Sequence, residues 1–294
     1  MAMDERKFVD ADGIDTCYYE KGTGPVMVLF HGGNFGSPDA ADCALDWATN
    51  FDGLSERYHV YAIDKIGQGY SDIPTVDDDY TMAAVVRHAC ATLDALGLKK
   101  THLVGHSRGG YLVCRMTLER PDLAATCTIV DSNSCAPGVG RNEVVLANPP
   151  EPRLGKESQR WILERYSYGT HHVTDDWLDA LVAIAARPQY RQAVDRMHDS
   201  GQLRFTRFLP QLATDKSEMF GWIRDRGMQC PTQLIWGYND PTAPIELGRA
   251  LFDLIALRER RARLEVFNQS GHFTYREHPQ AFNAALHGFI EGCG

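Results

Sequence analysis

The chain has 294 residues and a formal net charge of -9, and eight cysteines are spread along it. The excess of acidic side chains argues against nucleic acid or an anionic membrane as the main partner but says little about a small-molecule substrate, which we expect on other grounds. The cysteines form no CxxC pair and no Cys/His cluster at metal spacing. We therefore expect reduced thiols, no structural metal and no cofactor.

The N-terminal segment of thirteen residues is charged and contains no apolar stretch typical of a signal peptide. No apolar run approaches the roughly 18 residues that a membrane-spanning helix needs. These features predict a cytoplasmic protein.

Short apolar strands alternate with amphipathic helical segments over the first 130 residues. Two β-rich runs at 14–20 and 26–30 flank the turn-forming segment 21–25, which predicts a hairpin. The pattern then predicts helices at 42–54, 81–96 and 111–119, and strands at 59–64, 101–105 and 127–130. This alternation predicts an α/β fold with a mostly parallel central sheet and helices on both of its faces.

The pattern changes between residues 138 and 229. Helical periodicity is found there at 157–166, 175–186 and 189–199, without a strand pattern. The sheet resumes with strands at 232–236 and 263–267 and helices at 245–256 and 278–291. We therefore expect a core domain made of residues 1–137 and 230–294, and a helical lid (cap) inserted at 138–229.

Polar residues gather in the loops that follow the predicted strands. Four of these loops begin at His31, Asp64, His106 and Asp131. Ligands bind parallel sheets at the carboxyl ends of the strands, so we expect these loops to form one functional rim.

The candidate nucleophile is Ser107, in the motif Gly105-His106-Ser107-Arg108-Gly109 between a predicted strand and a predicted helix. A serine in this setting sits on a sharp turn, and the glycines allow the strand and the helix to approach each other closely. The same five-residue pattern also occurs in ordinary turns, so the argument depends on partner residues elsewhere in the chain.

A serine hydroxyl needs a base that a carboxylate orients. His272 follows the predicted strand 263–267 and is the histidine with the right order and rim position. Asp240, in the loop after strand 232–236, is the preferred acid, and Asp131 is the alternative. An oxyanion would be held by the backbone amides of Gly33 and Arg108. The Arg108 side chain is expected to point away from the pocket and to pair with an acidic residue.

Together these motifs resemble the α/β-hydrolase superfamily over nearly the whole chain. The residues that carry the resemblance are His31-Gly32-Gly33, Gly105-His106-Ser107-Arg108-Gly109-Gly110, Trp236-Gly237-Tyr238-Asn239-Asp240 and Gly271-His272-Phe273. The resemblance implies a Ser107–Asp240–His272 triad, an oxyanion hole of Gly33 and Arg108, and a helical lid. The C-terminal third is most similar to the meta-cleavage product hydrolases, which break a carbon–carbon bond in vinylogous diketones from aromatic degradation.

Three positions depart from that subfamily. His106 stands where its members usually have Asn, and Phe273 stands where they usually have Trp. The lid arginine that holds the dienoate is replaced in rough register by Ala180, with Arg187 or Arg191 one or two turns further on. We predict that the substrate contacts include Gly32, Asn34, His106, Phe273 and Arg187.

Three functional hypotheses follow. The first is a serine hydrolase that cleaves a carbon–carbon bond in a diketone-type compound. The second is a carboxylesterase or lactonase that uses the same triad. The third is a non-catalytic ligand receptor or a cofactor-free oxygenase on the same fold. Haloalkane dehalogenases and epoxide hydrolases need an acidic nucleophile, which Ser107 is not. By analogy with relatives that have a lid, the protein is expected to form a homodimer.

Overall fold

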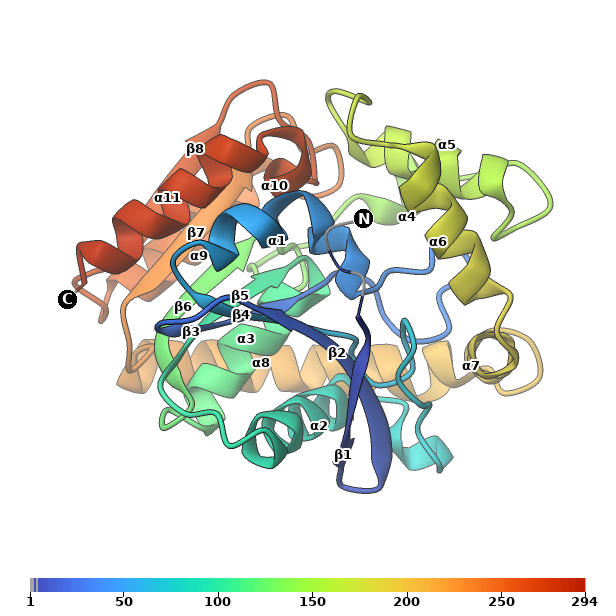
Figure 1. Cartoon of the computed structure of the whole chain (residues 1–294), viewed down its shortest axis with the longest axis horizontal. Helices are drawn as coiled ribbons and strands as arrows, with labels where there is room; N and C mark the ends of the chain where they lie inside the picture. The colour runs from blue at the N-terminus through green and yellow to red at the C-terminus, as the bar shows by residue number, and fades with distance from the viewer. Residues whose placement is uncertain (1–2, 4, 294) are drawn as a thin grey trace.

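The computed structural model describes Met3 and residues 5–293, so Met1, Ala2, Asp4 and Gly294 lie outside it, including part of the charged N-terminal segment. Eight strands form one sheet in the order β1-β2-β4-β3-β5-β6-β7-β8 (Figure 1). Their bounds are β1 Lys7–Ala11, β2 Ile14–Lys21, β3 Val26–Phe30, β4 His59–Ile63, β5 Thr101–His106, β6 Ala124–Val130, β7 Thr232–Gly237 and β8 Arg263–Phe267.

The strands from β3 to β8 pair in parallel, which confirms the predicted mostly parallel sheet. The central strands are continuous apolar runs because both faces of the sheet are covered; in β3, for example, Met27 to Phe30 are all fully buried. The carboxyl ends of β3 to β8 therefore meet at one edge of the sheet, where the predicted loops lie.

The hairpin predicted around residues 21–25 is wrong. β2 pairs antiparallel with β1 and β4, while β3 pairs with β4 and β5, so β2 and β3 are not neighbours. The hairpin of this chain is β1–β2, around Asp12-Gly13, whose φ angles are 58° and 80°. Two central residues with positive φ are what a tight two-residue β-turn requires, and Asp-Gly is a common pair there.

Helices cover both faces of the sheet, as predicted (Figure 1). One layer contains α1 (Ala48–Ser55), the short α10 (Thr274–Glu277) and α11 (Pro279–Glu291). The other layer contains α2 (Met82–Ala95), α3 (Arg108–Glu119) and α9 (Ile245–Ala256). Two short 3-10 turns precede α1 and α2, at Ala44–Trp47 and Asp77–Asp79. α2 begins where the hydroxyl of Thr81 accepts a hydrogen bond from the amide of Ala84.

Between β6 and β7 every residue is described and none belongs to a strand. The helices of this insertion are α4 Asn142–Val145, α5 Lys156–Tyr166, α6 Asp175–Ala185, α7 Pro188–Met197, a π-helical turn at Arg204–Phe208 and α8 Leu209–Arg226. In Figure 1, α4 to α7 form a separate group beside the carboxyl edge of the sheet. Helix α8, which the periodicity did not predict, instead packs on α2, α3 and α9 of the core.

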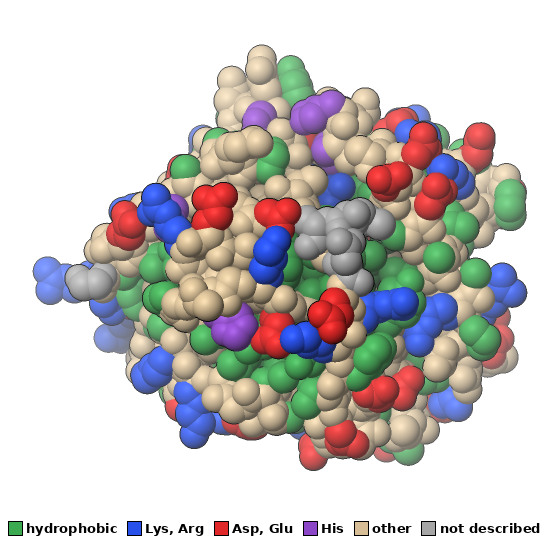
Figure 2. Space-filling model, viewed as in Figure 1, with side chains coloured by type: hydrophobic (Ala, Val, Ile, Leu, Met, Phe, Trp, Pro, Cys, Tyr) green, Lys and Arg blue, Asp and Glu red, His purple; other side chains and the backbone are tan. Residues whose placement is uncertain are grey.

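The surface shown in Figure 2 carries acidic and basic side chains side by side, without a broad field of one sign on that face. Within the described residues, no helix combines the length and the apolar character needed to cross a bilayer. All eight cysteines are free thiols, and seven of them are buried.

Candidate active site

Ser107 occupies a strained turn between β5 and α3. Its backbone angles are φ 52° and ψ -117°, a region that L-residues rarely adopt. Surrounding contacts hold it there: the Ser107 amide donates to the Val130 carbonyl at 2.8 Å, and the Ser132 hydroxyl donates to the Ser107 carbonyl at 2.5 Å. A Cβ at Gly105 would lie 2.0 Å from the Gly109 carbonyl oxygen, so this crossing requires glycine. The turn presents the Ser107 side chain at the rim.

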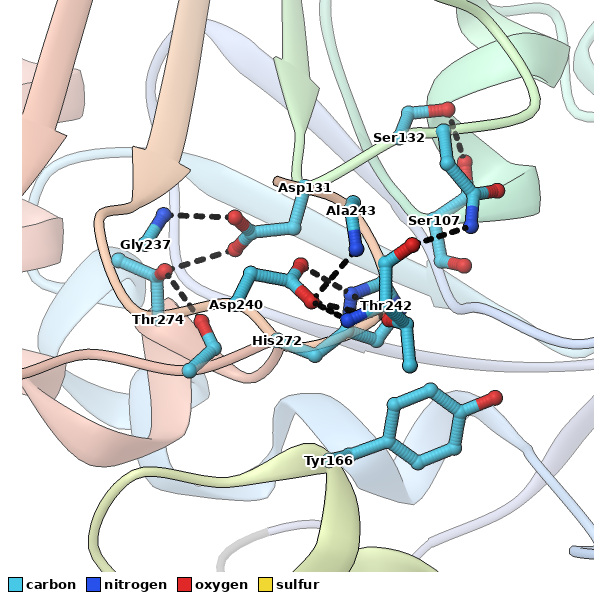
Figure 3. A network of polar contacts seen from close by, with 12 residues as sticks. Ser107, Asp131, Ser132, Tyr166, Gly237, Asp240, Thr242, Ala243, His272 and Thr274 are labelled. Carbon is cyan, nitrogen blue, oxygen red and sulfur yellow. Dashed lines mark hydrogen bonds and ion pairs between the residues drawn. The ribbon is translucent and has the colours of Figure 1, made fainter. Parts of the chain in front are cut away.

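Asp240 and His272 form a buried hydrogen-bonded pair. His272 Nδ1 lies 2.6 Å from Asp240 Oδ2, and both side chains are almost fully buried. The other carboxylate oxygen of Asp240 accepts hydrogen bonds from the Thr242 amide, the Thr242 hydroxyl and the Ala243 amide at 2.8 to 2.9 Å (Figure 3). The carboxylate is thus fixed by the backbone of its own loop, which leaves one oxygen to orient the imidazole.

Asp131, the alternative acid, has other partners. Its two oxygens accept hydrogen bonds from the Gly237 amide and the Thr274 hydroxyl, each at 2.7 Å (Figure 3). Burial and the nearby charge of Asp240 raise the pKa of Asp131 well above its usual value. Asp131 therefore ties the end of β7 to the loop of His272, and Asp240 is the carboxylate that contacts the imidazole.

His106 contacts the backbone of His272. Its Nε2 lies 2.8 Å from the His272 carbonyl oxygen, and because a carbonyl can only accept, Nε2 is the donor. Burial lowers the pKa of His106 well below its usual value, so the ring is neutral and Nδ1 carries no proton. Nδ1 is buried without a hydrogen-bond partner, and a Cβ at Gly32 would lie 2.9 Å from it. His106 thus positions the His272 loop, and Gly32 makes room for the His106 ring.

The side chain of Lys65 holds the glycine loop that follows β3. Its Nζ donates to the carbonyls of Gly32 and Gly33, at 2.8 Å each. Burial lowers the pKa of Lys65 to about 7. Gly33 has φ +63°, and a Cβ on it would lie 2.1 Å from Asp42 Oδ2. Because the C=O and N–H of a trans peptide point in opposite directions, the bond from Lys65 to the Gly32 carbonyl turns the Gly33 N–H away from Lys65.

A cavity of about 590 Å³ lies between the sheet edge and the insertion. Seven of the predicted site residues line it: Gly33, Asn34, His106, Ser107, Arg108, His272 and Phe273. Its volume is in the range of small-molecule sites. Asp240 and Gly32 do not line the cavity. Asp240 contacts His272, and Gly32 packs against the His106 ring, so each touches a residue of the cavity wall.

Arg187, predicted as a substrate contact, does not line this cavity. Its guanidinium donates to the Gly69 carbonyl and lies 5.1 Å from the ring centre of Tyr70. The prediction is wrong because the start of α7 faces the loop after β4. Ala180 and Arg191 do not line the cavity either, so the lid arginine expected from the resemblance has no counterpart at these positions.

The Arg108 side chain also differs from the expectation that it pairs with an acid. In the described residues it makes no ion pair, and its Nη1 is buried without a hydrogen-bond partner. Its guanidinium carbon lies 5.0 Å from the ring centre of Phe208. Burial, followed by the positive charge of Arg204, lowers the pKa of Arg108 to about 10.

Two aromatic side chains enclose His272. The Tyr166 ring, at the end of α5, stacks on the imidazole with a centre distance of 4.8 Å and an angle of 22° (Figure 3). The His272 amide donates to the Tyr166 carbonyl at 2.8 Å, which fixes the insertion to this loop. Phe273 packs edge-on against Tyr166 and Trp177 and forms part of the cavity wall.

A second cavity, of about 770 Å³, lies on the far side of the His272 loop. It is lined by α1, the segment 171–177 and the stretch 276–281, and it includes none of the predicted site residues. It is the larger of the two, but the strained serine and the Asp240–His272 pair both belong to the first.

Sequence reasoning missed several residues that shape the site, among them Lys65, Asp42 and Lys216. Lys65 was within reach of the pattern, because it directly follows a strand whose end lies on the rim. Asp42 lies in the segment that connects β3 to α1, and Lys216 lies in α8, the helix that periodicity did not predict. No local sequence signal pointed to either residue.

Comparison with known proteins gives a consistent result. A family model described as the alpha/beta hydrolase family matches residues 27–285. A 2-hydroxymuconate semialdehyde hydrolase from a Pseudomonas species is 26% identical over 95% of this chain and 92% of its own length. A 2-hydroxy-6-oxo-2,4-heptadienoate hydrolase from Pseudomonas putida is 26% identical over 97% of this chain and 95% of its own. The meta-cleavage product hydrolase CumD of Pseudomonas fluorescens superposes with a TM-score of 0.79 at 23% identity, covering 100% of this chain and 99% of that one.

Proposed function

Because the chain belongs to the alpha/beta hydrolase family, we propose that it is a serine-dependent hydrolase that cleaves a carbon–carbon bond in a diketone-type compound of the meta-cleavage-product class. The observation that carries the proposal is the 2.6 Å contact between His272 and Asp240 on the same cavity as Ser107 in its strained turn. The relatives that cover nearly the whole chain bear the names of such hydrolases.

In the proposed reaction, Ser107 Oγ attacks the ketone carbon or activates a water that attacks it, and His272 takes the hydroxyl proton. The amides of Gly33 and Arg108 stabilise the negative charge that develops on the carbonyl oxygen, in the orientation that Lys65 imposes on the glycine loop. The carbon–carbon bond then breaks, its electron pair stays on the departing carbon, and His272 returns the proton. When Ser107 is the attacking group, water hydrolyses the acyl-serine by the reverse set of proton transfers.

We also propose that the insertion at 138–229 acts as a lid on this cavity. Support comes from Tyr166, which stacks on His272, and from Arg204 and Lys216, which contribute to the cavity wall. The homodimer and the cytoplasmic location stay predictions from the sequence.

The test is turnover of a 2-hydroxy-6-oxohexa-2,4-dienoate, followed by loss of the dienoate chromophore, in the parent protein and in Ser107→Ala. We expect Ser107→Ala to lose most of the turnover and to keep its affinity for the substrate. Ser134→Ala is the matched control, because this serine also lines the cavity, and it should keep most of the turnover. Normal turnover in Ser107→Ala would refute the mechanism.

A panel of p-nitrophenyl esters separates the proposal from a carboxylesterase or lactonase. Efficient ester cleavage together with an inert dienoate would favour the esterase. Labelling with a fluorophosphonate tests the receptor and oxygenase alternatives, because only an activated Ser107 reacts. Absence of labelling at Ser107 would favour those alternatives.

A further inference from the structure

On one side of the cavity, Arg108 and Lys216 make no ion pair with an acidic side chain of the described residues, although the more distant charges of Glu143 and Asp42 act on Arg108. Arg108, directly after Ser107, lines the cavity with its Nη1 buried and unpartnered. Within the described residues no carboxylate lies within ion-pair distance of this guanidinium, whose carbon lies 5.0 Å from the centre of the Phe208 ring. A buried cation without a counterion is unfavourable unless a ligand supplies one.

Lys216 of α8 contributes a second cation to the same wall. Its Nζ donates to the carbonyls of Asn133 and Gly138, at 3.2 and 3.3 Å. An ammonium group has three donors, so one is left for another partner. No carboxylate of the described chain pairs with Lys216. Arg108 and Lys216 line the same cavity. Burial lowers the pKa of Lys216, and the positive charge of Arg108 lowers it further.

The other arginines that line the cavity are neutralised. Arg153 pairs with Asp39 at 2.8 Å, and Arg204 pairs with Glu143 at 2.7 Å. Arg153 and Arg204 each have a carboxylate partner, whereas Arg108 and Lys216 have none among the described residues. The excess of positive charge is therefore local to the side formed by α3 and α8.

We propose that the Arg108 guanidinium and the Lys216 ammonium form a subsite for a carboxylate group of the substrate. This inference rests on the proposed function and specifies which residues recognise the acid. It places the carboxylate between α3 and α8, and not at the lid positions of Ala180, Arg187 and Arg191, which do not line the cavity. The planar guanidinium can bind a carboxylate through two parallel hydrogen bonds, and the lysine adds a third.

The subsite also has a chemical consequence. In the 2,6-dioxo tautomer of a 2-hydroxy-6-oxo-dienoate, formed when the 2-hydroxyl proton moves to C5, the electron pair that cleavage releases on C5 is delocalised onto the 2-oxo oxygen, next to the carboxylate. Cations held at that end stabilise the charge that develops there. Arg108 would then serve the reaction twice, with its amide at the oxyanion and its side chain at the acid.

Binding to a catalytically blocked protein tests this subsite without turnover. The probes are sorbate, a six-carbon dienoate anion, and its neutral methyl ester, titrated by calorimetry into Ser107→Ala. Arg108→Met and Lys216→Met are made in that background; methionine removes the charge and keeps an unbranched side chain, and the Arg108 backbone amide is unchanged. Arg153→Met is the control, since this arginine lines the same cavity but is paired with Asp39.

We expect sorbate to bind Ser107→Ala more tightly than methyl sorbate does. Arg108→Met and Lys216→Met should each weaken sorbate binding by roughly 10- to 100-fold, the range for hydrogen bonds to charged groups, with little effect on the ester. Arg153→Met should leave the preference unchanged. Equal binding of acid and ester, no binding of either, or a preference that survives both substitutions would each overturn the proposal.

The proposed function fails independently of this result. A protein that prefers sorbate through Arg108 but never cleaves a 2-hydroxy-6-oxo acid refutes only the carbon–carbon hydrolase. A protein that cleaves that acid equally well after Arg108→Met and Lys216→Met refutes only the carboxylate subsite.

Discussion

The strained backbone conformation of Ser107 lowers the stability of the folded protein. With φ 52° and ψ -117°, a residue with a Cβ is strained, and glycine is not. Replacing Ser107 by alanine removes the hydroxyl and keeps the strain, whereas replacing it by glycine removes both. The two variants should be equally inactive but should differ in their free energy of unfolding.

The size of the difference follows from two opposing effects. Relief of the strain is worth about 1–3 kcal/mol. Glycine also makes the unfolded chain more flexible, which costs about 0.4–1 kcal/mol relative to alanine. Ser107→Gly should therefore be more stable than Ser107→Ala by roughly 0.5–2 kcal/mol. With an unfolding entropy of about 2.1 cal/mol/K per residue, this corresponds to about 1–3 °C in Tm for a chain of this length.

Urea unfolding and differential scanning calorimetry of the two variants measure this difference directly. The urea m-values should agree, because the surface exposed on unfolding is the same. A Ser107→Gly protein that is no more stable than Ser107→Ala would show that the surrounding hydrogen bonds do not hold a strained conformation at this turn.

Three further predictions concern other parts of the chain. Asp240→Asn should lower kcat by about 10³- to 10⁴-fold, because the imidazole loses the carboxylate that orients it; Asp131→Asn should lower kcat far less, and equal losses would contradict the distinction. Burial lowers the pKa of His88 to about 4 from 6.5, so between these pH values the unfolded chain binds more protons and stability falls as pH falls. Urea unfolding at pH 7 and 4.5 should therefore show that His88→Gln loses about 2–3 kcal/mol less than the parent on acidification, and parallel losses would disprove this. Gly105→Ala should destabilise the fold by several kcal/mol, because its Cβ would lie 2.0 Å from a backbone oxygen of α3. Gly288→Ala, in α11 with no atom within 4 Å of the new Cβ, should stabilise the fold by about 0.5–1 kcal/mol. Thermal melts should therefore show a lower Tm for the first variant and a higher Tm for the second.

Local patterns in the sequence were sufficient for most of the elements. The strand Arg263–Phe267 and the helix Ile245–Ala256 have the predicted bounds, because alternation, helical periodicity and turn residues act over a few neighbouring residues. The Gly105-to-Gly109 motif predicted a strand–turn–helix, and that turn is present. The order of Ser107, Asp240 and His272, each after a parallel strand, predicted that they lie on one rim, since parallel strands end at the same edge.

Strand neighbours and side-chain partners were decided by the tertiary structure. Periodicity does not encode the order of strands in a sheet, so β2 was paired with β3 although its neighbours are β1 and β4. Asp131 and Asp240 both follow strands, and although spacing favoured Asp240, it is the path of each loop that shows which carboxylate reaches His272. The unpaired charge of Arg108 depends on which acids lie within a few ångströms of it, and those residues are distant in the sequence. The sequence can therefore predict a functional residue that a local motif marks, such as Ser107. The partners of a side chain depend on distances between residues far apart in the sequence, so only the tertiary structure shows them.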